Sequence, residues 1–178
     1  MQATRILIAF YSRKGNNYLN GKIVDLPIGN TEVAAAMIQQ LTHGDLFQID
    51  TVQAYPKDYT RATEVAQEEM DRKARPKLAR DLDSLDGYDL ILLGYPNWWG
   101  TAPMAVFTFL ESHDLSGKTI LPFCTHEGSG LGHSESDLKA SCPGARVLKG
   151  LAIQGGSVRK AEGPISAWLG QAAVTQRI

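Results

Sequence analysis

Short apolar runs alternate along this chain with longer stretches in which apolar and polar residues recur at helical spacing. The runs at residues 5–11, 90–93 and 119–124 are rich in β-forming residues and contain few polar positions. A run that is apolar on both faces is typical of a parallel strand covered by helices on both sides. Two weaker runs, at 46–49 and 147–153, predict two further strands.

Five helices are predicted from the segments that follow the strands. Residues 31–41 place apolar side chains on one face, and residues 63–74 place Glu four positions before Arg or Lys. Pro103 and Pro164 suit the first turn of a helix, and Ser134 can cap a short one. Strands that alternate with helices predict an α/β fold with three layers, in which the middle layer is a doubly wound, five-stranded parallel sheet.

The whole chain, residues 1–178, is predicted to be a single domain with two insertions. The insertions lie near 16–28 and near 55–80, and both are more polar than the predicted core elements. The second insertion is interpreted as a solvated face, and a lid or a dimer contact are the alternatives.

Composition and charge narrow the class of protein. Apolar residues make up 43% of the 178 residues, charged residues make up 21%, and the net charge is −1. This balance is typical of a globular protein and argues against a general nucleic-acid binder, which needs a basic face. No apolar run reaches the roughly 18 residues that suggest a membrane span. With two cysteines and no secretory signal pattern, we expect a cytoplasmic protein.

The loops that follow the strands are the candidate ligand site, because doubly wound sheets bind ligands beyond the carboxyl ends of their strands. Three such loops, at 12–17, 95–100 and 125–132, are rich in glycine, hydroxyl and amide groups. Asn30 and Thr31 begin the first predicted helix, whose free N–H groups can bind a phosphate. Simple capping of that helix by either side chain is the alternative.

Other nucleotide and metal motifs fail on spacing. A phosphate loop of the GxxxxGK[ST] kind would end at residues 117–119, but position 112 is Ser. Residues 128–132 read GSGLG, which is not GxGxxG and follows the fourth strand rather than the first. Cys124 and two nearby histidines lack the spacing of a zinc site. The same cysteine is predicted to be a buried strand residue rather than a nucleophile.

Two of the three tryptophans, Trp98 and Trp99, are adjacent in the stretch GYPNWWG. Neighbouring side chains point in different directions on a strand or a helix, so we expect at least one indole at a surface. Aromatic faces bind planar ligands, although tryptophan is also enriched at protein contacts such as those of a homodimer. A ligand with a phosphate at one end and a wide aromatic ring at the other would span the indoles and the phosphate-like loop. Flavin mononucleotide (FMN) has that shape.

These segments together resemble the flavodoxin-like family, specifically bacterial FMN-binding members with the motif YPxWWGTxP. The resemblance rests on RILIAFYSRKGN, GNTEVA, GYPNWWGTAP, EGSGLGHS and PISAWL, and so covers most of the chain. It implies the strand order 2-1-3-4-5 and non-covalent FMN. By motif, it implies that the phosphate is held by Ser12, Asn17, Asn30 and Thr31, and that the ring is enclosed by Pro96, Asn97, Trp98, Trp99 and Gly100 on one side and by Thr125, His126, Glu127, Gly128, Ser129 and Gly132 on the other.

Two departures from the family pattern bear on function. Lys14 stands where the family usually has Thr, and an insertion separates SRKGNN from GNT, so either half of the split loop can hold the phosphate. Flavodoxins that carry electrons are typically strongly acidic, whereas this chain has a net charge of −1. We therefore expect an FMN-dependent oxidoreductase that passes electrons from NAD(P)H to a small quinone-like acceptor. The alternatives are an electron carrier between redox partner proteins and a protein-binding module without flavin.

Overall fold

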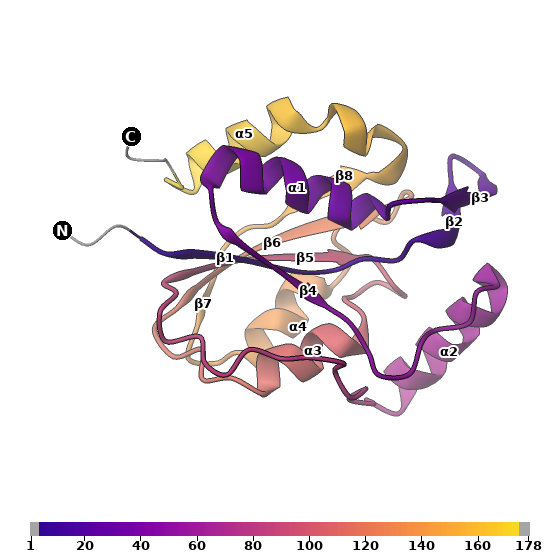
Figure 1. The fold of residues 1–178 in the computed structure, drawn as a ribbon, viewed down its shortest axis with the longest axis horizontal. Coiled ribbons are helices and arrows are strands. Elements are labelled where there is room, and N and C mark those ends of the chain that lie inside the picture. The colour runs from indigo at the N-terminus through magenta and orange to yellow at the C-terminus, as the bar shows by residue number, and fades with distance from the viewer. Residues whose placement is uncertain (1–3, 175–178) are drawn as a thin grey trace.

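The structure of the chain is a computed structural model that describes residues 4–174. Its centre is a six-stranded parallel sheet with helices on both faces (Figure 1). The strands of this sheet are β1 (Ile6–Tyr11), β4 (Asp45–Ile49), β5 (Leu90–Pro96), β6 (Thr119–His126), β7 (Arg146–Val147) and β8 (Leu151–Gln154). The helices are α1 (Asn30–Thr42), α2 (Tyr59–Asp71), α3 (Met104–Glu111), α4 (Ser134–Ser141) and α5 (Glu162–Gln171), with a 3-10 helix, η1 (Gly155–Lys160), before the last.

The strand order of the sheet is β4-β1-β5-β6-β7, and β8 also pairs with β6. Because β7 and β8 are two halves of the fifth predicted strand, this is the order 2-1-3-4-5, and the predicted α/β fold is confirmed. The prediction of one continuous strand over 147–153 is wrong. Residues 121–122 of β6 lie opposite residues 148–150, so one extra residue forms a bulge that divides the strand.

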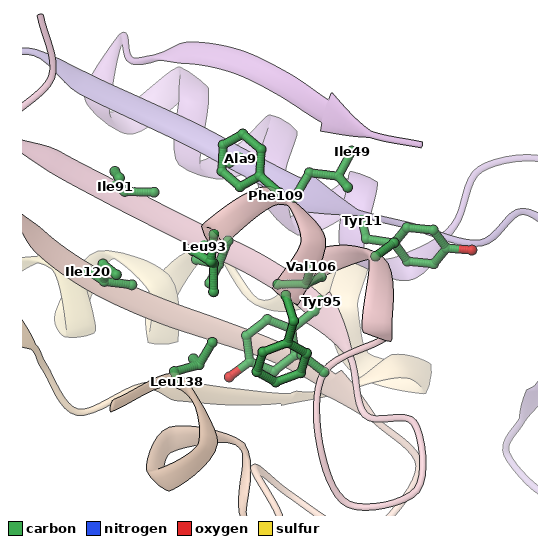
Figure 2. Packing of buried hydrophobic residues seen from close by; sticks show 14 of the residues in the cluster. Ala9, Tyr11, Ile49, Ile91, Leu93, Tyr95, Val106, Phe109, Ile120 and Leu138 are labelled. Atoms are coloured by element: carbon green, nitrogen blue, oxygen red, sulfur yellow. The ribbon is translucent and has the colours of Figure 1, made fainter. Parts of the chain in front are cut away.

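Both layers of core come from the apolar strands, whose successive side chains point to opposite faces of the sheet. Figure 2 shows the layer beneath α3 and α4, where Ile91, Leu93 and Tyr95 of β5 lie in one cluster. Leu90 and Leu92 belong to the opposite cluster, beneath α1 and α5. The central strands β1 and β5 are therefore apolar along nearly their whole length, because both of their faces are covered.

The helix predicted at 63–74 begins earlier and ends earlier than its charge pattern indicates. The carboxylate of Asp58 accepts a hydrogen bond from the amide of Arg61 at 2.8 Å, and this cap starts α2 at residue 59. The helix ends at residue 71, before Arg72 and Lys73, and Glu69 accepts a hydrogen bond from the hydroxyl of Tyr55 at 2.6 Å. The last helix also begins two residues before Pro164.

The two insertions lie at the same end of the molecule, beyond the carboxyl end of β1 (Figure 1). The first forms an antiparallel hairpin of β2 (Gly15–Leu19) and β3 (Lys22–Leu26). The second supplies α2 and then returns to the sheet, where Thr51 and Leu78 form an isolated bridge. Both insertions are therefore placed beside the loops predicted to bind a ligand. Within residues 4–174, no helix combines the length and the apolar character needed to cross a membrane.

Candidate functional site

The amino end of α1 lies directly behind the loop that follows β1. Gly29 precedes the helix, and a side chain at this position would overlap the Ser12 hydroxyl. That hydroxyl accepts a hydrogen bond from the amide of Glu32 at 3.1 Å. Helix geometry leaves the amides of Asn30 and Thr31 without an acceptor inside the helix. These two amides and the positive end of the helix dipole are suited to an anion.

Asn97 connects the loops after β5 and β6. Its backbone amide donates a hydrogen bond to the carbonyl of Thr125 at 2.8 Å, and its side-chain nitrogen donates one to the carbonyl of Gly130 at 2.9 Å. Its side-chain oxygen accepts from the amide of Gly100 at 2.9 Å. One carboxamide thus holds both loops at a fixed separation.

The two tryptophans belong to a tight turn, in which the side chain of Trp98 packs against the core and that of Trp99 lies at the surface. Trp99 and Gly100 both have positive φ, 57° and 85°, as in a type I′ turn, and the amide of Trp98 donates to Thr101. The Trp98 ring packs edge-on against Tyr11, with 5.2 Å between ring centroids. Trp99 is 47% exposed, which confirms the expectation that at least one indole lies at a surface.

Two adjoining cavities lie between these loops and the insertions. The larger has a volume of about 440 Å³ and the smaller about 190 Å³. The residues that line both are Arg13, Asn17, Tyr59, Asn97, Trp98 and Ser129. Their combined size is within the range of small-molecule sites. The larger cavity has indole walls, and the smaller one contains the start of α1.

Helix α2 forms one wall of the larger cavity, and the prediction that residues 55–80 form a solvated face is wrong for this helix. The lining side chains lie one helical turn apart on a single face: Tyr59, Ala62, Thr63 and Ala66. The indole nitrogen of Trp99 donates to the carbonyl of Thr63 at 2.9 Å, which joins the tryptophan turn to this helix. The spacing of small residues among polar ones is the signal that could have indicated a buried face.

Twelve of the fifteen predicted site residues line one or both cavities, and the structure brings them together from four segments of the chain. They are Asn17, Asn30, Thr31, Pro96, Asn97, Trp98, Trp99, Gly100, Thr125, His126, Glu127 and Ser129. The cavities have six further lining residues that were not among the predicted site residues: Arg13, Tyr18, Tyr59, Ala62, Thr63 and Ala66.

The other three predicted residues, Ser12, Gly128 and Gly132, support the loops instead. Ser12 caps α1, as described above, and the amide of Gly128 donates to Nδ1 of His126 at 2.9 Å. Gly132 has a φ of 54°, and its α-carbon lies so close to the carbonyl of Gly100 that a side chain would overlap it. The glycine therefore allows the loops after β5 and β6 to touch.

Charges around the smaller cavity are few and specifically placed. The guanidinium of Arg13 is engaged with backbone carbonyls, including that of Pro56 at 2.9 Å. One carboxylate oxygen of Glu127 accepts a hydrogen bond from the backbone amide of Asn20 at 2.9 Å. Its other oxygen, Oε1, is buried and has no hydrogen-bond partner within residues 4–174. The smaller cavity is therefore lined by a carboxylate that the hairpin holds through one oxygen, while its other oxygen is buried.

Buried titratable groups near the site are held in their neutral forms. Burial raises the pKa of the Cys124 thiol to about 12 and also raises the pKa of the Tyr11 phenol. Burial is the main cause of the raised pKa of Tyr59, and the Tyr18 phenol adds to it. A protonated thiol is a poor nucleophile, in agreement with the interpretation of Cys124 as a buried strand residue.

A family profile described as flavodoxin matches residues 26–171 of this chain. The chain belongs to the flavodoxin family. The match spans α1, the sheet from β4 onward and all of α5, so it includes two of the three loops that line the cavities. A search of curated proteins finds no match to this chain.

Solved structures give the same fold. A proposed flavoprotein from Bacteroides eggerthii is 31% identical, with a TM-score of 0.78 over 96% of this chain and 99% of the other. A second, from Bacteroides uniformis, is 28% identical, with a TM-score of 0.73 over 93% of this chain and 99% of the other. A Lactobacillus acidophilus flavoprotein in complex with FMN is 20% identical, with a TM-score of 0.66 over 93% of this chain and 99% of the other. At that identity the last likeness shows the fold alone.

Proposed function

We propose that this flavodoxin-family chain binds FMN non-covalently in the two adjoining cavities and acts as an oxidoreductase on a small acceptor. The observation that carries this proposal is the pair of cavities itself. One has indole walls and the other contains the amino end of α1, and both share the wall formed by Asn97 and Trp98. A single ligand with a flat ring and an anionic end would fill both.

The residues present fit FMN at its two ends. The amides of Asn30 and Thr31 and the helix dipole suit a phosphate. The smaller cavity is lined mainly by hydroxyl and amide groups, whereas the larger one has Trp98 and Trp99 on one side and α2 on the other. Aromatic and apolar walls exclude water from a planar ring and stack on it.

Bound FMN would supply the redox chemistry, because a flavin exchanges either a hydride or single electrons. The protein would bind and orient it. Asn97 holds the loops after β5 and β6 together, and Trp99 and Gly100 of the turn line the larger cavity. No protein acid or base is needed for a hydride transfer, which agrees with the neutral phenols and thiol around the site.

The net charge of −1 supports a small acceptor rather than a basic redox partner protein. The proposal therefore includes NAD(P)H as electron donor and a quinone-like compound as acceptor. A carrier between proteins would instead show little turnover unless a partner protein were present.

The test begins with the purified protein titrated with FMN and monitored by flavin absorbance at about 450 nm and by flavin fluorescence. We expect one equivalent to bind and the stacked indole to quench the flavin fluorescence. The holoprotein should then sustain NAD(P)H oxidation with a small quinone and no second protein. Failure to bind FMN would overturn the whole proposal, whereas binding without turnover would leave the carrier function.

A further inference from the structure

Among residues 4–174, Arg13 is the only charged residue that lines the larger cavity. The other lining side chains are neutral, and no carboxylate is among them. None of the ion pairs in the same part of the chain involves Arg13. A cation that lines a cavity without a carboxylate beside it favours an anion there, because the protein walls reduce the screening by water.

The guanidinium of Arg13 is held in place by the two insertions. Its Nε atom donates to the carbonyl of Asn16 at 3.1 Å, and its Nη2 atom donates to the carbonyls of Pro56 and Lys57, both at 2.9 Å. These neutral partners fix the position of the guanidinium and leave its charge uncompensated. Its third nitrogen, Nη1, makes no hydrogen bond within the described part of the chain and is not among its buried, unpartnered atoms. Nη1 is therefore accessible and available to donate to a ligand.

The walls of the larger cavity suit a flat molecule. Trp98 and Trp99 line it from the turn after β5, and α2 lines it with Ala62 and Ala66. The side chains of these two alanines are single methyl groups, so they leave room in front of the helix. An aromatic ring between such walls gains stacking and is removed from water.

The place of the second reactant follows from the proposed FMN site. A hydride passes between two molecules only when the reacting atoms are in close contact, so the acceptor must lie against one face of the flavin ring. If the flavin stacks on Trp98, its other face is turned toward α2, and the acceptor lies between the two. Arg13 lines the same cavity, so its charge acts on a molecule bound there.

We propose that the acceptor is a planar aromatic anion, such as a quinone with an acidic substituent, and that Arg13 selects it through its charge. The proposal rests on the proposed function and adds the class of substrate to it. Arg13 is then a specificity-determining residue of the larger cavity. The hairpin and the segment before α2 act through Asn16, Pro56 and Lys57 as the elements that position its guanidinium.

Two probes of the same shape that take no part in redox chemistry test this on the FMN-loaded protein. They are 2-naphthalenesulfonate, which is an anion, and 2-naphthalenesulfonamide, which is neutral. Their dissociation constants are measured by isothermal titration calorimetry. We expect wild type to bind the sulfonate more tightly by a factor of about 10, because a hydrogen bond between charged groups is stronger than a neutral one. Arg13→Gln should abolish this preference, and Arg13→Lys, which keeps the charge, should retain part of it.

Two further variants separate charge from space. Ala66→Leu enlarges a side chain in the wall formed by α2 and should weaken both probes by the same factor, since it removes room and not charge. Lys57→Gln removes an exposed positive charge that lines neither cavity, so it is the matched control and should keep the preference for the sulfonate. The ratio of kcat/KM for a sulfonated naphthoquinone to that for its unsubstituted parent should follow the probe preference across the variants. Thermal unfolding of each variant reports whether the fold is intact.

If wild type binds no FMN, the proposed function fails and this inference fails with it. If wild type binds FMN but binds the two probes equally, or if Arg13→Gln weakens both by the same factor, only this inference is overturned. The same holds if Arg13→Gln weakens FMN relative to riboflavin, because the guanidinium then faces the phosphate. It also holds if the variant slows flavin reduction by NADH and leaves the probe preference unchanged, because Arg13 then serves the electron donor. Should Arg13→Gln not fold, Arg13→Lys decides in its place: a retained preference supports the inference and equal binding of the probes overturns it.

Discussion

The hydroxyl groups of Thr31 and Thr125 lie 2.7 Å apart and share a hydrogen bond in the interior. Their residues are only 2% and 4% exposed. The bond joins the first turn of α1 to the end of β6, and thus fixes two sides of the smaller cavity relative to each other. Each hydroxyl is therefore shielded from bulk solvent and is the hydrogen-bond partner of the other.

Replacing either threonine by valine should therefore destabilise the protein. Thr31→Val or Thr125→Val leaves a buried hydroxyl unsatisfied and should lower the free energy of unfolding by about 1–3 kcal/mol. The double variant removes both polar groups, so its loss should be smaller than the sum of the single losses. Urea unfolding of the four proteins measures this. Strictly additive losses would show that the two hydroxyls do not interact.

The two tryptophans should differ in what they contribute. Trp98 packs against Tyr11 and Tyr55, so Trp98→Ala should lower the free energy of unfolding by about 2–3 kcal/mol as well as weaken FMN binding. Trp99 is half exposed, so Trp99→Ala should change stability by about 1 kcal/mol or less and still weaken FMN binding. Chemical unfolding and FMN titration of both variants separate the effects. Equal stability losses would contradict the assignment of Trp98 to the core.

Two glycines of the loop after β6 provide a matched pair. Gly132→Ala would place a β-carbon onto the carbonyl of Gly100, and should lower the free energy of unfolding by about 3 kcal/mol or more. Gly130 also has positive φ, 60°, but open space around it, so Gly130→Ala should cost only about 1–2 kcal/mol of backbone strain. Thermal and urea unfolding give both values. A larger loss for Gly130→Ala would show that strain, not contact between loops, dominates.

The buried cysteines should make the protein less stable at alkaline pH. Burial raises the pKa of Cys124 to about 12 and that of Cys142 to about 11, from 9.0. The unfolded chain therefore loses these protons first as pH rises, and binds fewer protons than the folded chain between about pH 9 and pH 12. The free energy of unfolding should fall over this window and be unaffected below it.

Urea unfolding at pH 8, 9, 10 and 11 measures this slope, and Cys124→Ala should make it shallower. Buried Tyr95, whose pKa is also raised by burial, contributes in the same direction, so some slope should remain. A slope identical to that of wild type would mean that Cys124 does not titrate differently in the two states. The same thiol should resist alkylation until the protein is unfolded.

Much of the fold could be predicted from the sequence because the strands are buried on both faces. Such strands are apolar at every position, and this pattern depends on local residues alone. The boundaries of α2 were predicted less well, because the charged residues that indicated the helix lie toward its carboxyl end, whereas its Asp58 cap lies before them. The bulge between β7 and β8 depends on the register with β6, which no local pattern encodes.

The candidate site, too, was predicted in part from the sequence and decided in part by packing. Loops after strands are marked by glycine, hydroxyl and amide residues, so their position along the chain predicted most of the lining residues. Tyr59 and Arg13 were missed because they line the cavities only through the docking of the insertions. Ser12 and Gly132 had the residue types of a binding loop, but packing gave them structural contacts instead.

By itself, then, the sequence determined the class of fold, the strand order implied by its family and the loops at which a ligand would bind. These follow from burial on both faces of the strands and from residues that suit loop backbones. Only the tertiary structure decided that α2 forms a wall of the larger cavity, and that the amide of Asn20 holds the carboxylate of Glu127 beside the smaller one. The physical reason is distance along the chain. Contacts between such remote residues depend on how the elements pack, and single-residue preferences do not carry that information.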